Sequence, residues 1–454
     1  MNLKITQILA VVIGILVIAG LVLVVTRREG PAEVTENVQE IVENYQASGN
    51  VSVAHWWTID VEEQGFRVLK NKMEQLYPNM TLTPVPVPGG AGGNMPPRIL
   101  PSLVAGTNIP GSFQSHPGYE TARYGGYYLR NLNDLWEYAN IAERVPAIVE
   151  KMCKLDGNYY LVPVGVHRTN VVFYNKQLLQ QLGIDMTNPP RTWEEFFNLC
   201  DLIKQRAQER GLNIYPLEVG DGMGTDWAAT QIFETIMAGY SLQTYEKFIN
   251  GTVTAGELEP ILQLFKRYLS YVPGDHRARN WAEACGQLFN GRVAMYVHGD
   301  WANAYFEQRG WTLGVQYDIF LAPGTENLFG LVVDGFVVPK KGNVIGGLRW
   351  VYSYTTLEVQ SSFNPVKGSV SPYRDVPDNI YTNSYARNAA SALRNPQTKF
   401  YPSFTHGIAI PNEILYDLHP KISEFVEFQN VSASASTIAS LIRSGTYTIS
   451  WDIV

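Results

Sequence analysis

Residues 167–170 place four side chains that can form hydrogen bonds, in the order His-Arg-Thr-Asn, inside an otherwise apolar part of the chain. Strand-like apolar patterns precede this polar block at residues 159–166 and follow it at residues 171–174. A buried strand seldom carries so many polar groups in succession unless polar partners satisfy them. The block, His167 included, is therefore predicted to recognise a polar group. It favours a small, uncharged, hydroxyl-rich ligand over catalysis.

Standard catalytic motifs are missing from the sequence, which has no HExxH, no GxSxG, no Walker-type lysine loop and no zinc-type pairing of Cys and His. The glycine-rich run at residues 89–93 could hold an anion at the start of the helix that follows. Its Asn-Met-Pro-Pro continuation supplies few backbone N–H donors, which favours a tight turn or a backbone that faces a ligand. Histidines at the ends of apolar runs raise zinc as an alternative, but carboxylates at ligand spacing are lacking. We expect neither a metal nor a cofactor.

Several tryptophans lie beside polar residues at the ends of predicted elements, namely Trp57, Trp227, Trp281 and Trp301. A sugar ring has an apolar C–H face, while its hydroxyls point outward in the plane of the ring. Its recognition therefore needs aromatic faces together with side chains that form hydrogen bonds in that plane. Charged partners form the stronger hydrogen bonds. For each tryptophan the alternative is an ordinary place in the core.

The segments around these side chains predict an α/β body. Residues 50–116 alternate strand, helix, strand, helix, strand, which implies a parallel sheet with helices on both faces. Ligands of such sheets bind beyond the carboxyl ends of the strands, where Trp57 and residues 114–116 are expected. Further helical patterns lie at residues 192–203, 227–237, 258–269, 281–289 and 412–443.

The composition and the N-terminal segment indicate an exported protein. The chain has 454 residues, the length of two or three domains, and its net charge of −7 disfavours binding to nucleic acid. Residues 8–25 form an apolar run that would span about 27 Å as a helix, close to the hydrocarbon core of a bilayer. The run has no clear cleavage site, so an uncleaved membrane anchor is favoured over a cleaved export signal. Residues 29–49, rich in Glu, are predicted to form a stalk.

The three cysteines, Cys153, Cys200 and Cys285, are far apart in the sequence and form no CxxC motif. An odd number allows at most one disulfide within the chain. Cys200 falls on the apolar side of a predicted helix, which favours a buried free thiol there. Whether any disulfide forms stays open.

Taken together, several stretches resemble an extracellular solute-binding protein of the carbohydrate ABC-importer class. Within that class the chain is most similar to the glucose/galactose-binding proteins of thermophiles, from about residue 51 to residue 443. The stretches are HWWT (55–58), GGAGGN (89–94), SFQSHPG (112–118), LVPVGVHRTNVVFYNK (161–176), PPRTWEEF (189–196), GRVAMYVHGDWA (291–302), DGFVVPK (334–340), FNPVKGS (363–369) and THGIAIP (405–411). The narrower combination that suggests a hexose is Gln114, His116, Asp334, Lys367 and His406.

The resemblance implies a two-lobed periplasmic-binding-protein type II fold of the α/β class, with hinge strands and a ligand cleft between the lobes. It implies a first lobe of residues 50–163 and 296–345, and a second lobe of residues 164–295 and 346–454. The expected domain order is thus an anchor or signal at residues 1–28, the stalk, and the two-lobed body from residue 50.

The resemblance also implies roles for single residues. Trp57 and one of Trp281 or Trp301 would stack on the sugar ring. The residues that would form hydrogen bonds with the hydroxyls are His116, Asp334, Lys367 and His406. Those that would complete or line the pocket are Gln114, His167 and Trp227.

The implied function is that of an extracytoplasmic sugar-binding subunit of an ABC importer, without enzymatic activity. It would bind a glucose-like or galactose-like hexose and deliver it to a membrane permease, while residues 8–25 anchor it to the cell membrane. One alternative is the same fold with an oligosaccharide as ligand, since the loop at residues 220–226 looks longer than expected. The other is a secreted glycoside hydrolase, which would need paired carboxylates about 5–9.5 Å apart. No motif pairs Asp334 with Asp300 or Glu62.

Overall fold

The computed structural model of the protein describes residues 37–89, 92–222, 227–451 and 453. The predicted anchor at residues 8–25 lies outside this part. Within the described residues, no helix combines the length and apolar character that a membrane crossing requires. From Val38 onward, the described chain belongs to one compact unit.

The end of the predicted stalk belongs to the folded body. Helix α2 (Val38–Glu43) buries Ile41 and Val42. The Tyr77 hydroxyl donates to the Val42 carbonyl at 2.7 Å, and Arg349 Nε donates to the Ile41 carbonyl at 2.9 Å. These bonds satisfy carbonyls at the helix end, so this segment is part of the folded unit and not a free spacer.

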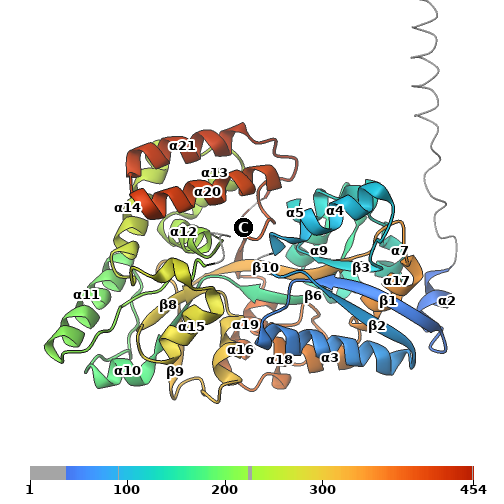
Figure 1. Cartoon of the computed structure of the whole chain (residues 1–454), viewed down its shortest axis with the longest axis horizontal. Coiled ribbons are helices and arrows are strands. Elements are labelled where there is room, and N and C mark those ends of the chain that lie inside the picture. The colour runs from blue at the N-terminus through green and yellow to red at the C-terminus, as the bar shows by residue number, and fades with distance from the viewer. Residues whose placement is uncertain (1–36, 90–91, 223–226, 452, 454) are drawn as a thin grey trace, which may run out of the picture. The chain divides into compact units, whose positions relative to one another are not determined.

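The larger sheet joins three parallel strands to a long antiparallel one. Its strands follow the order β11-β10-β3-β1-β2, and β6 also pairs with β10. The bounds are β1 (Ser48–His55), β2 (Asn79–Pro86), β3 (Ser112–Ser115), β6 (Leu161–Arg168), β10 (Leu328–Val337) and β11 (Lys399–Pro402). The chain crosses from β1 to β2 and back past β1 to β3. Right-handed crossovers therefore put α3 (Asp60–Leu76) and α4 (Met95–Ala105) on opposite faces, as Figure 1 shows. The predicted alternation and helix placement are confirmed.

Strand β10 has a gap along one edge. It pairs with β11 over residues 328–331 and with β3 over residues 335–337, so residues 332–334 face neither strand. On its other edge, the pairing with β6 shifts register between Asp334 and Gly335. Such irregularities re-aim side chains. Asp334 therefore lies within the strand, at the point where the sheet opens.

A second sheet places β7 (Val171–Asn175) between β8 (Met295–His298) and β9 (Tyr317–Leu321), with both pairings antiparallel. Only Thr169 and Asn170 separate β7 from β6, so this short crossing connects the two sheets. In Figure 1, β6 and β10 run from the larger sheet toward β8 and β9.

The strand pairing divides the chain differently from the predicted lobes. Residues 295–298 and 317–321 pair with β7, although the sequence assigned residues 296–345 to the first lobe. Helices α17 (Val344–Ser353) and α18 (Leu357–Lys367) pack against α3 of the larger sheet, although they were assigned to the second lobe. Helical periodicity shows which face of a helix is apolar but not which sheet covers it.

The remaining elements cover the two sheets. The shorter helices are α5 (Tyr119–Ala122), α6 (Gly125–Tyr128), α7 (Asn133–Tyr138), α8 (Ile141–Arg144), α9 (Ala147–Cys153), α10 (Lys176–Gln181), α13 (Leu242–Ile249), α15 (Trp281–Phe289) and α16 (Ala302–Glu307). The longer ones are α11 (Trp193–Glu209), α12 (Trp227–Tyr240), α14 (Ala255–Leu269), α19 (Ser384–Arg394), α20 (Asn412–Phe428) and α21 (Val431–Ser444). The small elements are β4 (Lys154–Leu155), β5 (Asn158–Tyr159), η2 (His276–Ala278) and η3 (Asp378–Ile380). The helices predicted from periodicity are confirmed, and α11 starts at the expected capping box of Thr192 and Glu195.

The three cysteines form no disulfide within the described chain. Cys153, Cys200 and Cys285 are all buried and free. The pKa of each thiol lies above its usual value because burial disfavours the thiolate. Within the described chain they act as small core residues.

The polar block at residues 167–170 has two roles: it joins the two sheets, and it contributes one side chain to a cavity. The sequence predicted only the second role. Arg168 donates to the Leu328 carbonyl, and Asn170 accepts from the Gly330 N–H at 2.9 Å. These bonds tie the crossing between the sheets to the start of β10. His167 alone in this block reaches the cavity described below. The expectation that the whole block faces a ligand is therefore wrong, because Arg168 and Asn170 pair with backbone groups and Thr169 does not line the cavity.

Candidate ligand-binding site

One cavity of about 180 Å³ lies where the carboxyl ends of β1 and β3 meet the gap in the edge of β10. This is the position in which α/β sheets bind ligands. Trp56, Glu62, Asn280 and the glycines Gly89 and Gly220 contribute to its wall. The predicted site residues that line it are Trp57, His116, His167, Trp227, Trp281, Trp301, Asp334, Lys367 and His406.

Gln114 is the predicted site residue that lies behind the wall. Its side chain is fully buried. Its Oε1 accepts from the Trp56 N–H at 3.1 Å, and its Nε2 donates to Asp334 Oδ1 at 3.3 Å. The amide thus joins the end of β1 to the carboxylate of β10.

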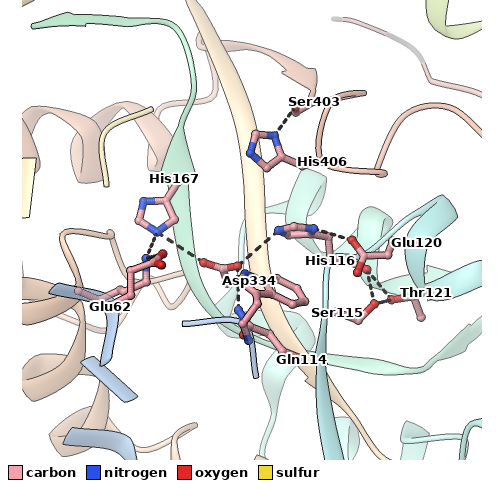
Figure 2. A network of polar contacts seen from close by, with 12 residues as sticks. Glu62, Gln114, Ser115, His116, Glu120, Thr121, His167, Asp334, Ser403 and His406 are labelled. Atoms are coloured by element: carbon pink, nitrogen blue, oxygen red, sulfur yellow. Dashed lines mark hydrogen bonds and ion pairs between the residues drawn. The ribbon is translucent and has the colours of Figure 1, made fainter. Parts of the chain in front are cut away.

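Asp334 is the centre of a buried polar network, shown in Figure 2. Its Oδ1 lies 3.5 Å from His116 Nε2, and its Oδ2 lies 3.5 Å from His167 Nε2. Burial raises the pKa of Asp334, but the hydrogen bond from His116 and the charge of Lys367 hold it well below its usual range. The side chain is therefore a carboxylate at neutral pH, able only to accept hydrogen bonds.

His116 lies between two carboxylates. Its Nδ1 is 2.6 Å from Oε2 of Glu120, four residues later in the chain, and its Nε2 faces Asp334. Burial lowers the pKa of His116, but the charge of Glu120 and the hydrogen bond with Asp334 outweigh it and raise the pKa to about 9. His116 is therefore a cation at neutral pH.

Lys367 is the last residue of α18 and is only 3% exposed. Its Nζ lies 3.2 Å from His167 Nε2, 3.5 Å from Glu62 Oε1 and 5.2 Å from the centre of the Trp57 ring. Contact with an aromatic face stabilises a cation. This ammonium is therefore held among buried partners and is not a solvated surface cation.

Glu62 lines the cavity but was not among the binding residues expected from the sequence. It lies in the first turn of α3, directly after the strand end that carries Trp57. Burial raises the pKa of Glu62 to about 7, although the charge of Lys367 acts to lower it. The available signal was its position in the sequence, at the carboxyl end of a predicted parallel strand.

The opposite part of the wall is aromatic and comes from elements around the second sheet. Trp227 begins α12, Trp281 begins α15, and Trp301 precedes α16. The rings of Trp227 and Trp301 are 6.2 Å apart, and Trp301 Nε1 donates to His298 Nε2 at 2.9 Å. Each tryptophan is at most 8% exposed. This part offers flat apolar surfaces without a formal charge.

His406 stands between the two parts of the wall. Its ring is 5.5 Å from His116 and 5.5 Å from Trp301. Its Nδ1 lies 2.8 Å from the Ser403 hydroxyl. Burial and the charge of His116 lower the pKa of His406 well below its usual value, so this ring is neutral.

Comparisons with known proteins identify the family. The sequence profile of the bacterial extracellular solute-binding proteins matches residues 60–343. An uncharacterized ABC transporter extracellular-binding protein of Pyrococcus horikoshii is 34% identical over 90% of this chain and 88% of its own. The chain belongs to the bacterial extracellular solute-binding protein family.

Further relatives agree with this assignment. A probable sugar-binding periplasmic protein of Brucella suis is 27% identical over 89% of this chain and 93% of its own. The solved structure of a chitin oligosaccharide binding protein superposes with a TM-score of 0.74, at 19% identity, over 88% of this chain and 99% of the other. The expected two-lobed α/β fold is thus confirmed, and this solute-binding protein is extracytoplasmic and not an enzyme.

Proposed function

We propose that this solute-binding protein captures a neutral sugar, a hexose, outside the cytoplasm and delivers it to the permease of an ABC importer. The observation that carries the proposal is the convergence of buried tryptophan faces with Asp334 and Lys367 on one cavity. A sugar needs both kinds of surface, since its C–H face is apolar and its rim carries hydroxyls.

The charges of the site support a neutral ligand. His116 lies between Glu120 and Asp334, and Lys367 faces Glu62. Both cations therefore already have acidic side chains as partners within the protein. An anionic solute such as a sugar phosphate would enter without an unpaired cation to receive it, at a large cost in desolvation.

An oligosaccharide is the second candidate. Gly89, Gly220 and Gly222 form part of the cavity wall, so backbone would face a ligand there. The remainder of the two loops, residues 90–91 and 223–226, lies outside the described chain. A second sugar ring could extend along this glycine-lined part of the wall.

Anchoring of the protein to the cell membrane is part of the same proposal. Residues 8–25 would hold the protein at the outer surface of the cell membrane, near the permease. Removal of these residues should release the protein from sedimented membranes without changing its sugar affinity. Release at high salt while residues 8–25 are present would contradict an inserted anchor.

The test is isothermal titration calorimetry of the full chain in a detergent without a sugar head group. The panel comprises D-glucose, D-galactose, maltose, maltotriose and glucose 6-phosphate. We expect a dissociation constant near micromolar, about −8 kcal/mol, for one of the two hexoses. Tighter binding of maltose or maltotriose would favour the second candidate. Binding of glucose 6-phosphate alone, or of no saccharide, would overturn the proposal.

A further inference from the structure

Each of three histidines in the cavity wall is linked through Nδ1 to a buried carboxylate that does not itself line the cavity. The links are His116 to Glu120, His167 to Asp300, and His406 through Ser403 to Glu234. We propose that Glu120, Asp300 and Glu234 are positioning residues that fix the protons on these rings. They would thereby set which cavity atoms donate and which accept hydrogen bonds. The inference rests on the proposed function only for the identity of the ligand.

For His167, the surroundings determine the tautomer. An ammonium can only donate, and Lys367 Nζ lies 3.2 Å from His167 Nε2. Asp334 Oδ2 is farther from that nitrogen, at 3.5 Å. The nearer ammonium therefore makes Nε2 the acceptor, so the ring proton is on Nδ1, 2.7 Å from Asp300 Oδ1. The second oxygen of Asp300 accepts from the Tyr385 hydroxyl at 3.1 Å. Asp300 thus holds His167 in the tautomer whose Nε2 accepts a hydrogen bond from Lys367.

For His406, the same result follows through a hydroxyl. Ser403 Oγ donates its one proton to Glu234 Oε2 at 2.9 Å. It must therefore accept from His406 Nδ1, 2.8 Å away, which leaves the lone pair of Nε2 for a ligand. Glu234 is fully buried on α12 and also accepts from the Phe404 and Thr405 N–H groups. It fixes the loop as well as the ring.

For His116, two carboxylates fix both protons. Glu120 Oε2 is 2.6 Å from Nδ1, and Asp334 lies on the Nε2 side. A ring between two acceptors donates from both nitrogens, which requires the imidazolium form. Glu120 is on α5 and only 4% exposed, so its charge is screened little by water.

These three carboxylates together give the cavity a defined pattern. Asp334 and His406 Nε2 accept, whereas Lys367 donates. A hydroxyl can satisfy either kind of partner, since it donates one proton and accepts through its lone pairs. A ligand edge that only donates, such as an ammonium group, cannot pair with Lys367. These donors and acceptors are already in place in the sugar-free protein, so the cavity favours hydroxyl-rich solutes.

The test is long-range ¹H–¹⁵N correlation spectroscopy of the histidine rings, which distinguishes protonated from bare ring nitrogens. In the sugar-free protein we expect a proton only on Nδ1 in His167 and His406, and protons on both nitrogens in His116. A proton on Nε2 of His167 or His406 would overturn the inference. This measurement needs no ligand, so it remains decisive even if the sugar assignment fails.

The variant that tests the positioning role is Asp300→Asn, which keeps the shape but can offer an N–H to the ring. Such a change reverses the tautomer of a neighbouring histidine. We expect the His167 proton to move to Nε2 and the affinity for D-glucose to fall on the order of tenfold. The matched control is Tyr385→Phe, which removes the other partner of Asp300 and should leave the His167 tautomer unchanged. An unaltered His167 ring in Asp300→Asn would contradict the role.

Discussion

The cavity has two unlike walls, which come from different parts of the fold. The charged wall consists of Glu62, His116, Asp334 and Lys367, carried by the larger sheet and by helices α3 and α18. The aromatic wall consists of Trp227, Trp281 and Trp301, carried by elements around the second sheet. Behind it lies the His298 ring, which contacts all three tryptophans. One wall offers directed hydrogen bonds and the other offers flat apolar surface. A closing two-lobed protein can use both only when the walls approach one another around a ligand.

The comparison of His116 with His298 shows what makes the walls differ. Both rings are at most 2% exposed. Burial lowers the pKa of His298 to about 3, whereas the pKa of His116 is raised to about 9 because Glu120 and Asp334 outweigh the effect of burial. Burial alone therefore does not determine whether a histidine is charged. The neighbouring carboxylates decide it.

Substitution of the central carboxylate should have the largest effect on the charged wall. Asp334→Ala removes an ionised acceptor and leaves the His116 and Lys367 cations without it. We expect sugar affinity to fall by about 2 kcal/mol or more, roughly thirtyfold, in calorimetry. The control Asp318→Ala alters a carboxylate on β9 that pairs with Lys176 at 3.4 Å, and it should leave affinity within about twofold. If Asp334→Ala binds the sugar as tightly as the unaltered protein does, the charged wall has no part in sugar binding.

A smaller loss is expected from the aromatic wall. Trp281→Ala should weaken sugar binding by about 1 kcal/mol, roughly fivefold, because it removes one stacking face. The control Trp311→Ala changes a ring that stacks on Phe289 at 4.5 Å and does not line the cavity. It should lower the unfolding temperature without changing affinity. A loss of affinity in the control that matches that of Trp281→Ala would mean that stability, and not stacking, is being measured.

The two histidines should give stability profiles of opposite slope. The pKa of His116 is raised to about 9 in the fold, so its stabilisation is complete below its ordinary pKa of 6.5 and is lost as pH rises toward 9. The pKa of His298 is lowered to about 3, so stability declines as pH falls from 6.5 toward 3, where the unfolded chain binds the additional proton.

Denaturant unfolding at a series of pH values measures these slopes. His116→Gln should flatten the alkaline side of the profile and His298→Gln the acid side, each by on the order of 2 kcal/mol. If either variant flattens the opposite side, the assignment of charge to the two walls is wrong.

The smallest expected effect is that of salt. The ligand is predicted to be neutral and the charged wall is buried, so screening should act weakly on the complex. Sugar affinity should change by less than about twofold between 50 and 500 mM sodium chloride in calorimetry. A steep decline with salt would indicate a charged ligand and an exposed ionic contact.

Much of the site could be predicted because its side chains follow strand ends and helix starts. Trp57 follows β1, His116 follows β3, and Trp281 begins α15 behind the Asn280 cap. Local patterns specify such positions, and the fold gathers the carboxyl ends of parallel strands at one edge. The capping box of Thr192 is equally local, since its partner is three residues away.

The remainder depends on partners far away in the sequence. His167 and Asp300 are separated by 133 residues, and no local pattern links them. The packing of α18 on α3 and the pairing of β8 with β7 are also long-range, which is why the predicted lobe boundaries differ from the strand pairing. The backbone partner of the Arg168 side chain, the Leu328 carbonyl, lies 160 residues later in the sequence. It explains why that side chain turns away from the cavity.

The most direct test of the account is a crystal structure of the complex with the sugar that calorimetry selects. We predict one sugar ring in the cavity between Trp57 and the aromatic wall, with a hydroxyl oxygen about 2.5–2.7 Å from an Asp334 carboxylate oxygen. A sugar bound elsewhere, or one whose hydroxyls leave Asp334 and Lys367 with protein partners only, would contradict it.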